Sequence, residues 1–229
     1  MKRLSYRGMS RCKLFVSENK IFNCFRKLIY FFMLNKFYKR KNHISIKGFH
    51  SGNKVKIRGK GNTIILSKYT VLKKCNIRII GNNCKIIIDD GSILNKVSLS
   101  CRDDNSVIWI KNNADIGPNT KIISMEGNNI VIGENSLISY DVEIRNSDSH
   151  SIINADGIRI NKGNHIEIGN NVWIAGGAII LKGSNIGNNC VIGAHSVYTL
   201  KEAKNNSIFV GNPAKIIKDD IKEWNKDRL

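Results

Sequence analysis

The histidine at position 150 is the side chain of this protein best suited to proton transfer. It stands in the run Ser-Asp-Ser-His-Ser-Ile at residues 147–152. An imidazole accepts and returns a proton near neutral pH, which is what a general base must do. Asp148 could orient that ring or support its charge, but an Asp before a Ser can equally cap a turn. The alternative for His150 is a solvated loop histidine.

The six cysteines offer less chemistry. Their spacings match neither a CxxC pair nor a metal or disulfide framework, which favours a reducing, cytosolic setting. Cys190 is the candidate nucleophile among them. Because it lies two residues before Ile192, at a small position of the repeat described next, we expect it in the core. A covalent intermediate on Cys190 is therefore not expected.

The scaffold that must position these residues is indicated by an isoleucine repeat with a step of six. The chain holds 38 Ile and 30 Asn, which favours strands and turns and argues against a helical bundle or disorder. One in-phase set contains Ile132, Ile138, Ile144, Ile168, Ile174, Ile180, Ile186 and Ile192. Two shorter sets are Ile110, Ile116 and Ile122, and Ile87, Ile93 and Leu99. Such self-similarity points to a repeat architecture.

A step of six fits a short strand followed by a tight turn. Three such units form a coil of 18 residues, the distance between Gly169 and Gly187. The isoleucines then stack inside the coil, and Gly or Asn takes the corners, where φ is often positive. The predicted fold is an all-β parallel β-helix, stabilised by the stacking of one coil on the next.

The repeat breaks between Ile144 and Ile168. These residues are 24 apart where one coil would need 18, so six extra residues are expected to project within a loop at 146–165. His150 lies near the start of this loop. Loops on a rigid scaffold commonly carry function, which strengthens the case for His150.

Three segments resemble the left-handed β-helix acyltransferases of the hexapeptide-repeat family. They are Gly-Asn-Asn-Val-Trp-Ile-Ala-Gly-Gly-Ala (169–178), Ile-Gly-Ala-His-Ser-Val (192–197) and Gly-Asn-Pro-Ala-Lys-Ile-Ile (211–217). The run at 147–152, the long loop and Ile-x-x-Trp ending at Trp224 are similar to bacterial surface-polysaccharide O-acetyltransferases, including those of polysialic acid. The resemblance covers roughly residues 50–224 and is strongest over 128–217. It implies left-handed coils and a cytoplasmic transferase that uses acetyl-CoA.

The resemblance also implies site residues. His150 would be the base that takes the acceptor's hydroxyl proton, with Asp148 as its helper. The implied donor-binding residues are Trp173, Gly176, Ala194, Lys201, Pro213 and Lys215. Tyr140, Asp141 and Arg145 are candidates for acceptor binding, although ordinary outward positions on a coil would explain them too. Trp173 could instead be an aromatic residue at a subunit interface, since the family usually forms homotrimers with sites between subunits. No metal is implied.

Residues 1–42 differ from the rest of the chain. They carry +11 of the formal net charge of +19, and the apolar stretch 21–37 is interrupted by Arg26 and Lys27. A membrane-spanning helix needs about 20 apolar residues, so we expect a helix that either packs on protein or lies on the inner, anionic membrane face. The expected domains are this segment, the β-helix at 43–200, and a coenzyme A-contacting segment with a short helix at 201–229.

Other functions remain as alternatives. They are acyl transfer to the nitrogen or oxygen of a small or nucleotide-linked sugar, and a non-catalytic β-helix scaffold tethered by its basic N-terminus. Zinc carbonic anhydrases share the fold, but the closely spaced histidine pair of that family is absent, although His150, His165 and His195 are available. Charge alone would suggest nucleic-acid binding, which no reader motif supports.

Overall fold

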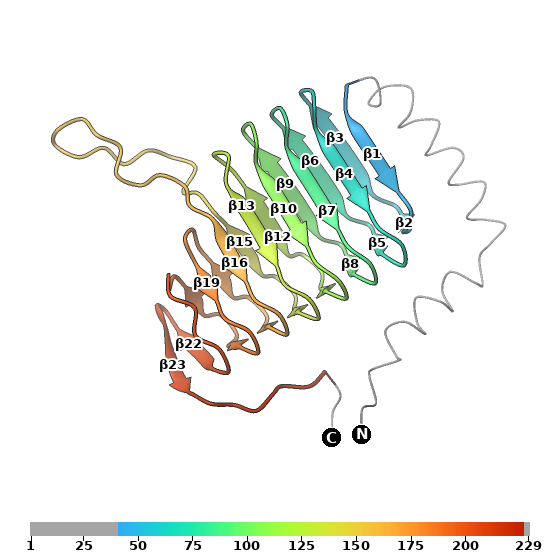
Figure 1. The fold of residues 1–229 in the computed structure, drawn as a ribbon. Coiled ribbons are helices and arrows are strands. Elements are labelled where there is room, and N and C mark those ends of the chain that lie inside the picture. Colours follow the sequence, from blue (N-terminus) through green and yellow to red (C-terminus); the bar gives the residue numbers. More distant parts are fainter. Residues whose placement is uncertain (1–40, 227–229) are drawn as a thin grey trace.

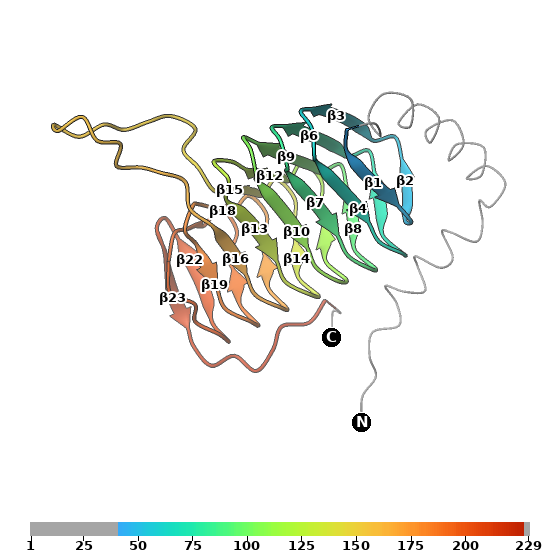
Figure 2. The ribbon, with the colours of Figure 1, turned by 45° about the horizontal axis from the view of Figure 1, so that its top comes forward.

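The computed structural model describes residues 41–226, which form a parallel β-helix. Three sheets, here called A, B and C, run along the length of the molecule, and the chain visits them in that order from β1 to β21 (Figures 1 and 2). All strand pairs are parallel except β22 with β23 and an isolated bridge in the loop. The predicted all-β parallel β-helix is confirmed. The helical segment expected within residues 1–42 lies outside the described residues, except for its last two positions.

The strands are short and distributed over the three sheets. Sheet A contains β1 (His43–Ile46), β4 (Thr63–Leu66), β7 (Lys85–Ile88), β10 (Val107–Ile110), β13 (Asn129–Ile132), β16 (Ile166–Ile168) and β19 (Asn185–Ile186). Sheet B contains β2 (Phe49–Ser51), β5 (Val71–Lys73), β8 (Ile93–Asn95), β11 (Asp115–Ile116), β14 (Leu137–Ile138), β17 (Trp173–Ile174), β20 (Val191–Ile192), β22 (Ile208–Gly211) and β23 (Ala214–Lys218). Sheet C contains β3 (Lys54–Arg58), β6 (Asn76–Ile80), β9 (Ser98–Arg102), β12 (Lys121–Ser124), β15 (Glu143–Arg145), β18 (Ile179–Ile180) and β21 (Val197–Tyr198).

The core is a set of isoleucine columns inside the coils, because side chains alternate between the two faces of each strand. All eight isoleucines of the longest in-phase set are at most 1% exposed, as are Ile110, Ile116 and Ile122. In the third set Leu99 is fully buried as expected, but the other two positions were assigned the wrong phase. Ile87 and Ile93 are only half-buried and face outward, while their neighbours Ile86, Ile88 and Leu94 are fully buried.

Coil length is not constant, which corrects the single value expected from the repeat. In the N-terminal part Val107 pairs with Asn129, 22 positions later. After the loop, Trp173 pairs with Val191, 18 positions later. The expectation of 18 residues per coil is therefore right for the C-terminal coils and wrong for the N-terminal ones. The long coils have two additional residues on sheet A and two on sheet C. In each pair one side chain points inward and the other points outward.

The corners, where the chain passes between sheets, use Gly and Asn for different reasons. Gly133, Gly169 and Gly187 do not have positive φ, contrary to expectation. They are needed because a Cβ on each would lie within 2.8 Å of the backbone of the next coil. Positive φ falls instead on Asn171 (53°) and Asn189 (55°), residues that tolerate the left-handed region. Their side chains also form a ladder, with Asn171 Nδ2 donating to Asn189 Oδ1 at 2.9 Å.

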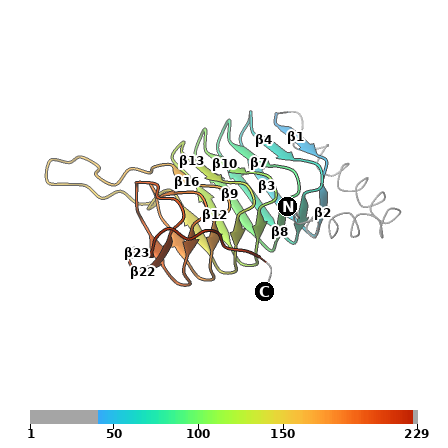
Figure 3. The same cartoon turned by 60° about the horizontal axis from the view of Figure 1, so that its bottom comes forward.

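The loop at 146–165 projects far from the body (Figures 1 and 3). Ile144 lies in β15 of sheet C and Ile168 in β16 of sheet A, which are consecutive strands of the chain. One six-residue step would join them, so the insertion is about 18 residues and not six. The sequence estimate was wrong because it counted the interval as a full coil instead of one side of a coil.

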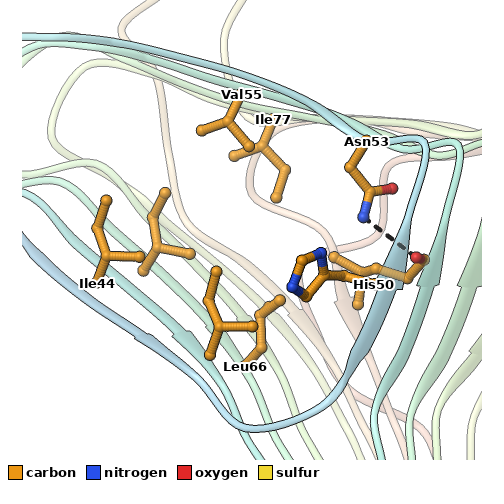
Figure 4. A pocket seen from close by; sticks show the side chains of 9 residues that line it. Ile44, His50, Asn53, Val55, Leu66 and Ile77 are labelled. Carbon is orange, nitrogen blue, oxygen red and sulfur yellow. Dashed lines mark hydrogen bonds between the residues drawn. The ribbon is translucent and has the colours of Figure 1, made fainter. Parts of the chain in front are cut away.

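The two ends of the β-helix are finished differently. At the C-terminal end the β22–β23 hairpin continues sheet B, and Phe209 packs edge-on against Tyr198 with both side chains buried. At the N-terminal end the first coil borders a largely apolar hollow that includes Ile44, Val55 and Ile77 (Figure 4). Among residues 41–226 no helix could span a membrane.

The short C-terminal helix predicted for this chain is absent from the described residues up to 226. Residues 219–226 are instead an irregular tail. Trp224 Nε1 donates to the Asn171 carbonyl at 2.6 Å, and Asn189 Nδ2 donates to the Lys222 carbonyl at 2.8 Å. These contacts hold the tail in an extended course against the corner between sheets A and B.

Candidate active site

The loop that carries His150 leaves the body at the corner between sheets C and A, hereafter the CA corner. The turn of the preceding coil at this corner contains Glu126, whose carboxylate accepts hydrogen bonds from both limbs of the loop. On the outgoing limb Ser147 Oγ donates to Glu126 Oε1. On the returning limb Arg159 Nη2 donates to Oε1 at 2.7 Å and the Gly163 amide donates to Oε2 at 3.0 Å. The loop base is thus fixed to the coil below it.

The turn of the following coil at the CA corner contains Lys182. Its ammonium group pairs with Asp148 on the outgoing limb and donates to the Asn161 carbonyl on the returning limb at 3.0 Å. Asn161 is itself only 8% exposed. Its Nδ2 donates to Asp148 Oδ2 and to the His150 carbonyl, both at 2.8 Å, and its Oδ1 accepts from the Ile152 amide at 2.7 Å. The residues around His150 are therefore tied at several points.

The carboxylates of this network are held ionised. The hydrogen bond from Lys182 is the main cause that lowers the pKa of Asp148, and Asn161 adds to it. The hydrogen bond from Arg159 is the main cause that lowers the pKa of Glu126 to about 2, with smaller contributions from Ser147 and Gly163. Both groups act as acceptors of charge-assisted hydrogen bonds, the stronger kind.

His150 is exposed at the start of the projecting loop. Asp148 was predicted to orient or support its ring. In the described residues the hydrogen bonds of the Asp148 carboxylate go to Lys182 and Asn161, and none joins it to the His150 ring. Asp148 therefore acts on the course of the backbone around His150 in this conformation.

The three candidates for acceptor binding do not lie together. Arg145 is in β15 beside the loop, where Nη2 donates to Ser149 Oγ at 3.1 Å and Nη1 pairs with Glu143 at 3.3 Å. Its Nε is buried without a partner among the described residues. Tyr140 and Asp141 lie on the corner between sheets B and C, hereafter the BC corner. Of the three, only Arg145 is brought to the His150 loop of the same chain.

The predicted donor-binding residues begin with Trp173, which is on the outer face of sheet B and 37% exposed. Its indole lies 6.0 Å from that of Trp224 in the C-terminal tail, a tilted aromatic pair. Gly176 is at the BC corner, where a Cβ would meet the Tyr140 ring at 2.8 Å. Ala194 lies exposed on the same corner one coil further.

The remaining donor candidates are near the C-terminal end. Lys201 follows β21 at the CA corner, one coil beyond Lys182. Pro213 forms the tip of the β22–β23 hairpin after a cis peptide bond, and Lys215 in β23 pairs with Val210. All three side chains are exposed. Within one chain, the candidates thus divide between the CA corner and the side formed by sheet B and the BC corner.

Cys190 is fully buried, and its Sγ donates to the Lys204 carbonyl at 2.9 Å. Burial also raises the pKa of its thiol, which disfavours the thiolate. The prediction that Cys190 is a core residue is confirmed.

The sequence interpretation missed Glu126, Arg159 and Asn161 as site residues, and it did not place Lys182 near His150. Glu126 and Arg159 are 33 positions apart, and Lys182 and Asp148 are 34 apart. No local pattern links such pairs. These residues could have been found only by assigning the insertion to the turn between sheets C and A. The turns of the neighbouring coils at the same corner would then have been the candidates for contacts with the loop.

Comparison with known proteins supports the same fold. Residues 165–197 match the family model described as bacterial transferase hexapeptide (six repeats). The chain is 33% identical over 142 residues to a polysialic acid O-acetyltransferase of Neisseria meningitidis, covering 62% of this chain and 65% of that protein. It is 28% identical over 174 residues to a putative lipopolysaccharide biosynthesis O-acetyl transferase, WbbJ, of Escherichia coli K12, covering 65% and 87%.

Among solved structures, that of the polysialic acid O-acetyltransferase OatWY superposes with a TM-score of 0.77 at 30% identity. The superposition covers 82% of this chain and 89% of OatWY. The aligned region includes most of the described β-helix, so the relationship rests on far more than the short repeat motif. This chain belongs to the hexapeptide-repeat acyltransferases, the family whose fold is a left-handed parallel β-helix.

Proposed function

We propose that this chain is an acetyl-CoA-dependent O-acetyltransferase that modifies a hydroxyl of a bacterial surface polysaccharide. The observation that carries the proposal is the rigidly based loop that presents His150 beside the β-helix. A histidine left by chance on a solvated loop would not need the hydrogen bonds from Asn161 to its carbonyl and to the neighbouring Asp148. The relatives, which include O-acetyltransferases of polysialic acid, support the substrate class.

The proposed reaction is a direct transfer in a ternary complex. The His150 imidazole takes the proton of the acceptor hydroxyl as its oxygen attacks the carbonyl carbon of the thioester. The carbon–sulfur bond then breaks, and the coenzyme A thiolate receives the proton from the imidazolium. The buried thiol of Cys190 supports this route over an acyl-enzyme.

The donor would lie along sheet B and the BC corner. There Trp173 and Ala194 offer exposed contact surface, and Lys215 offers a cation for the phosphates of coenzyme A. Lys201, at the CA corner, would offer another cation to a donor bound on a neighbouring chain. The Gly176 amide would approach the thioester oxygen, although the Tyr140 ring beside it gives that glycine a packing role as well. Because Trp224 already contacts Trp173, the tail would have to share the indole with the donor or move.

A homotrimer would bring the two groups of candidates together from different chains. Four isoleucines of the loop support an interface, because they are 53–63% exposed in the described part of the chain: Ile152, Ile153, Ile158 and Ile160. The test mixes two inactive variants, His150→Ala and Lys215→Glu, under conditions of subunit exchange. Activity that is recovered on mixing supports a site shared between chains. If no activity is recovered, the shared site is contradicted.

We also propose a cytoplasmic location, where acetyl-CoA is available, with residues 1–42 either packed on protein or bound to the anionic inner face of the membrane. Flotation with vesicles that contain phosphatidylglycerol separates these alternatives. Loss of flotation on deletion of residues 1–40 supports the membrane contact. Unchanged flotation, or none in the full chain, contradicts it.

The test of the function is a mass-shift assay with acetyl-CoA and a panel of bacterial glycans that includes sialic acid polymers. An increase of one acetyl mass on an alkali-labile ester supports the proposal. His150→Ala should reduce turnover by at least about 100-fold, since general bases contribute about 10²–10⁴-fold. The matched control is His43→Ala, an exposed histidine of β1. An acetylated amine, or near-normal turnover of His150→Ala, contradicts the proposal.

A further inference from the structure

We propose that Lys182 and Glu126 are positioning residues that hold the His150 loop from opposite sides, one from the coil after the loop and one from the coil before it. This inference rests on the proposed role of His150 as the base. The two groups have opposite charge and act on different residues. Glu126 binds Arg159, whereas Lys182 binds Asp148.

Each group contacts both limbs of the loop. The Glu126 carboxylate accepts a hydrogen bond from Ser147 on the outgoing limb and one from the Gly163 amide on the returning limb. Lys182 contacts Asp148 on the outgoing limb and the Asn161 carbonyl on the returning limb. Either group alone would close the base of the loop, and the two together oppose tilting toward either neighbouring coil.

The foot of the loop is connected to His150 through Asn161. The Asn161 side chain bridges Asp148 and the His150 carbonyl, and it accepts from the Ile152 amide. Ser149, between Asp148 and His150, has a φ of 66°, an uncommon value for a serine. Its amide donates to Ser147 Oγ at 3.0 Å, and its Oγ accepts from Arg145. The backbone on both sides of His150 is therefore fixed relative to the groups that Lys182 holds.

The consequence is that loss of Lys182 should displace His150 without disturbing the stacked coils. Lys182 lies at a corner and contacts the loop, while the core columns do not use its side chain. A small displacement of a catalytic group lowers the chemical step steeply, by up to about 100-fold per ångström. Binding of the donor on sheet B should change little.

The experiment compares Lys182→Met with Lys182→Arg and with the control Lys68→Met, an exposed lysine at a corner of an early coil. We expect kcat of Lys182→Met to fall at least about tenfold with KM for acetyl-CoA within about threefold of wild type. Lys182→Arg should restore most of kcat, because it keeps the cation. Lys68→Met should behave as wild type.

Hydrogen exchange of the loop amides gives a readout that does not depend on activity. In Lys182→Met the Ile152 amide should exchange at least about tenfold faster, with the amides of β17 and β18 unchanged. Normal exchange with normal kcat overturns the inference. So does a loss of kcat that Lys182→Arg does not rescue, or faster exchange throughout the coils.

The outcome for His150 separates this inference from the proposed function. If His150→Ala remains active, the proposed base is wrong, yet the exchange experiment still decides whether Lys182 fixes the loop. If His150→Ala is inactive and Lys182→Met is normal in kcat and in exchange, the function stands and the positioning role is overturned. Glu126→Gln provides the same comparison from the other side of the loop.

Discussion

The coils before the loop and the coils after it are two versions of the same architecture. Before the loop the usual coil length is 22 residues, and after it 18. The difference lies at the CA corner. In the long coils sheet C has a third inward column, Cys101, Ser124 and Asn146, and sheet A has a matching column that contains Cys84 and Ser106.

The loop lies where the β-helix changes from the long coils to the short ones and its cross-section becomes smaller. Asn146 is the last member of its column, is fully buried, and is the residue at which the chain leaves sheet C. Its Nδ2 donates to Ser124 Oγ at 3.1 Å, and its Oδ1 accepts from the Met125 amide at 2.8 Å. On the returning limb the Asn164 amide donates to the Asn146 carbonyl at 3.0 Å. The loop that carries His150 therefore lies at the change from the long coils to the short ones.

The largest loss of stability is expected from a substitution at the corner between sheets A and B, where the long and short coils also differ. The same corner position is Ser67 in a long coil and Gly169 in a short one. A Cβ at Gly169 would lie 2.7–2.8 Å from Asn188 and the Gly187 backbone. Gly169→Ala should therefore cost about 3 kcal/mol, a fall in Tm of roughly 6–12 °C in thermal melts.

Ser67→Ala is the matched control, because that position already accommodates a Cβ. It should melt within about 2 °C of wild type. Equal losses in Gly169→Ala and Ser67→Ala would show that the short coils are not packed more closely than the long ones.

The second effect concerns the residue that ends the long coils. Asn146→Ala leaves the part-buried Met125 amide without its acceptor, which should cost about 2 kcal/mol. Denaturant unfolding measures this loss, and faster hydrogen exchange of the loop should accompany it. Cys101→Ala, in the same column but two coils earlier, should spare the loop. If both variants speed hydrogen exchange of the loop equally, the order of the loop does not depend on the residue at which the long coils end.

The third effect concerns the tail, which contacts the short coils at Trp173 and Asn171. Trp224→Ala removes the tilted aromatic pair and one hydrogen bond, so we expect a loss of about 1 kcal/mol in denaturant unfolding. If the donor binds on Trp173, the affinity of Trp224→Ala for acetyl-CoA should rise or stay constant, because the Trp224 side chain no longer covers that indole. Trp173→Ala should weaken the affinity for acetyl-CoA. An unchanged affinity in Trp173→Ala would show that Trp173 is not part of the donor site.

The smallest effect is the pH dependence of the loop base. The pKa of Glu126 is lowered from 4.5 to about 2, so its stabilisation is complete above pH about 4.5 and lost as pH falls toward 2. The Tm of Glu126→Gln should lie roughly 2 °C below wild type at pH 6 and match it near pH 2. Circular dichroism melts over this range measure the difference. A gap that persists at pH 2 contradicts the assigned role of the carboxylate.

Much of the fold could be predicted because its main signal is local. Isoleucines such as Ile174 and Ile180 recur at a step of six, and their columns are buried as expected. The phase failed at Ile87 because the extra residues of the long coils shift the repeat. The predicted helix near Trp224 failed because the tail's contacts are with Asn171 and Trp173, more than 50 positions away.

By itself, the sequence determined the repeating coil, the buried columns, the break after Ile144 and the residue with base chemistry on that break. Each is a matter of spacing over a few residues, which periodicity records. The tertiary structure decided which residues of successive coils meet at one corner. Glu126, Asp148 and Lys182 come together only because parallel stacking sets each corner of one coil on the same corner of the next.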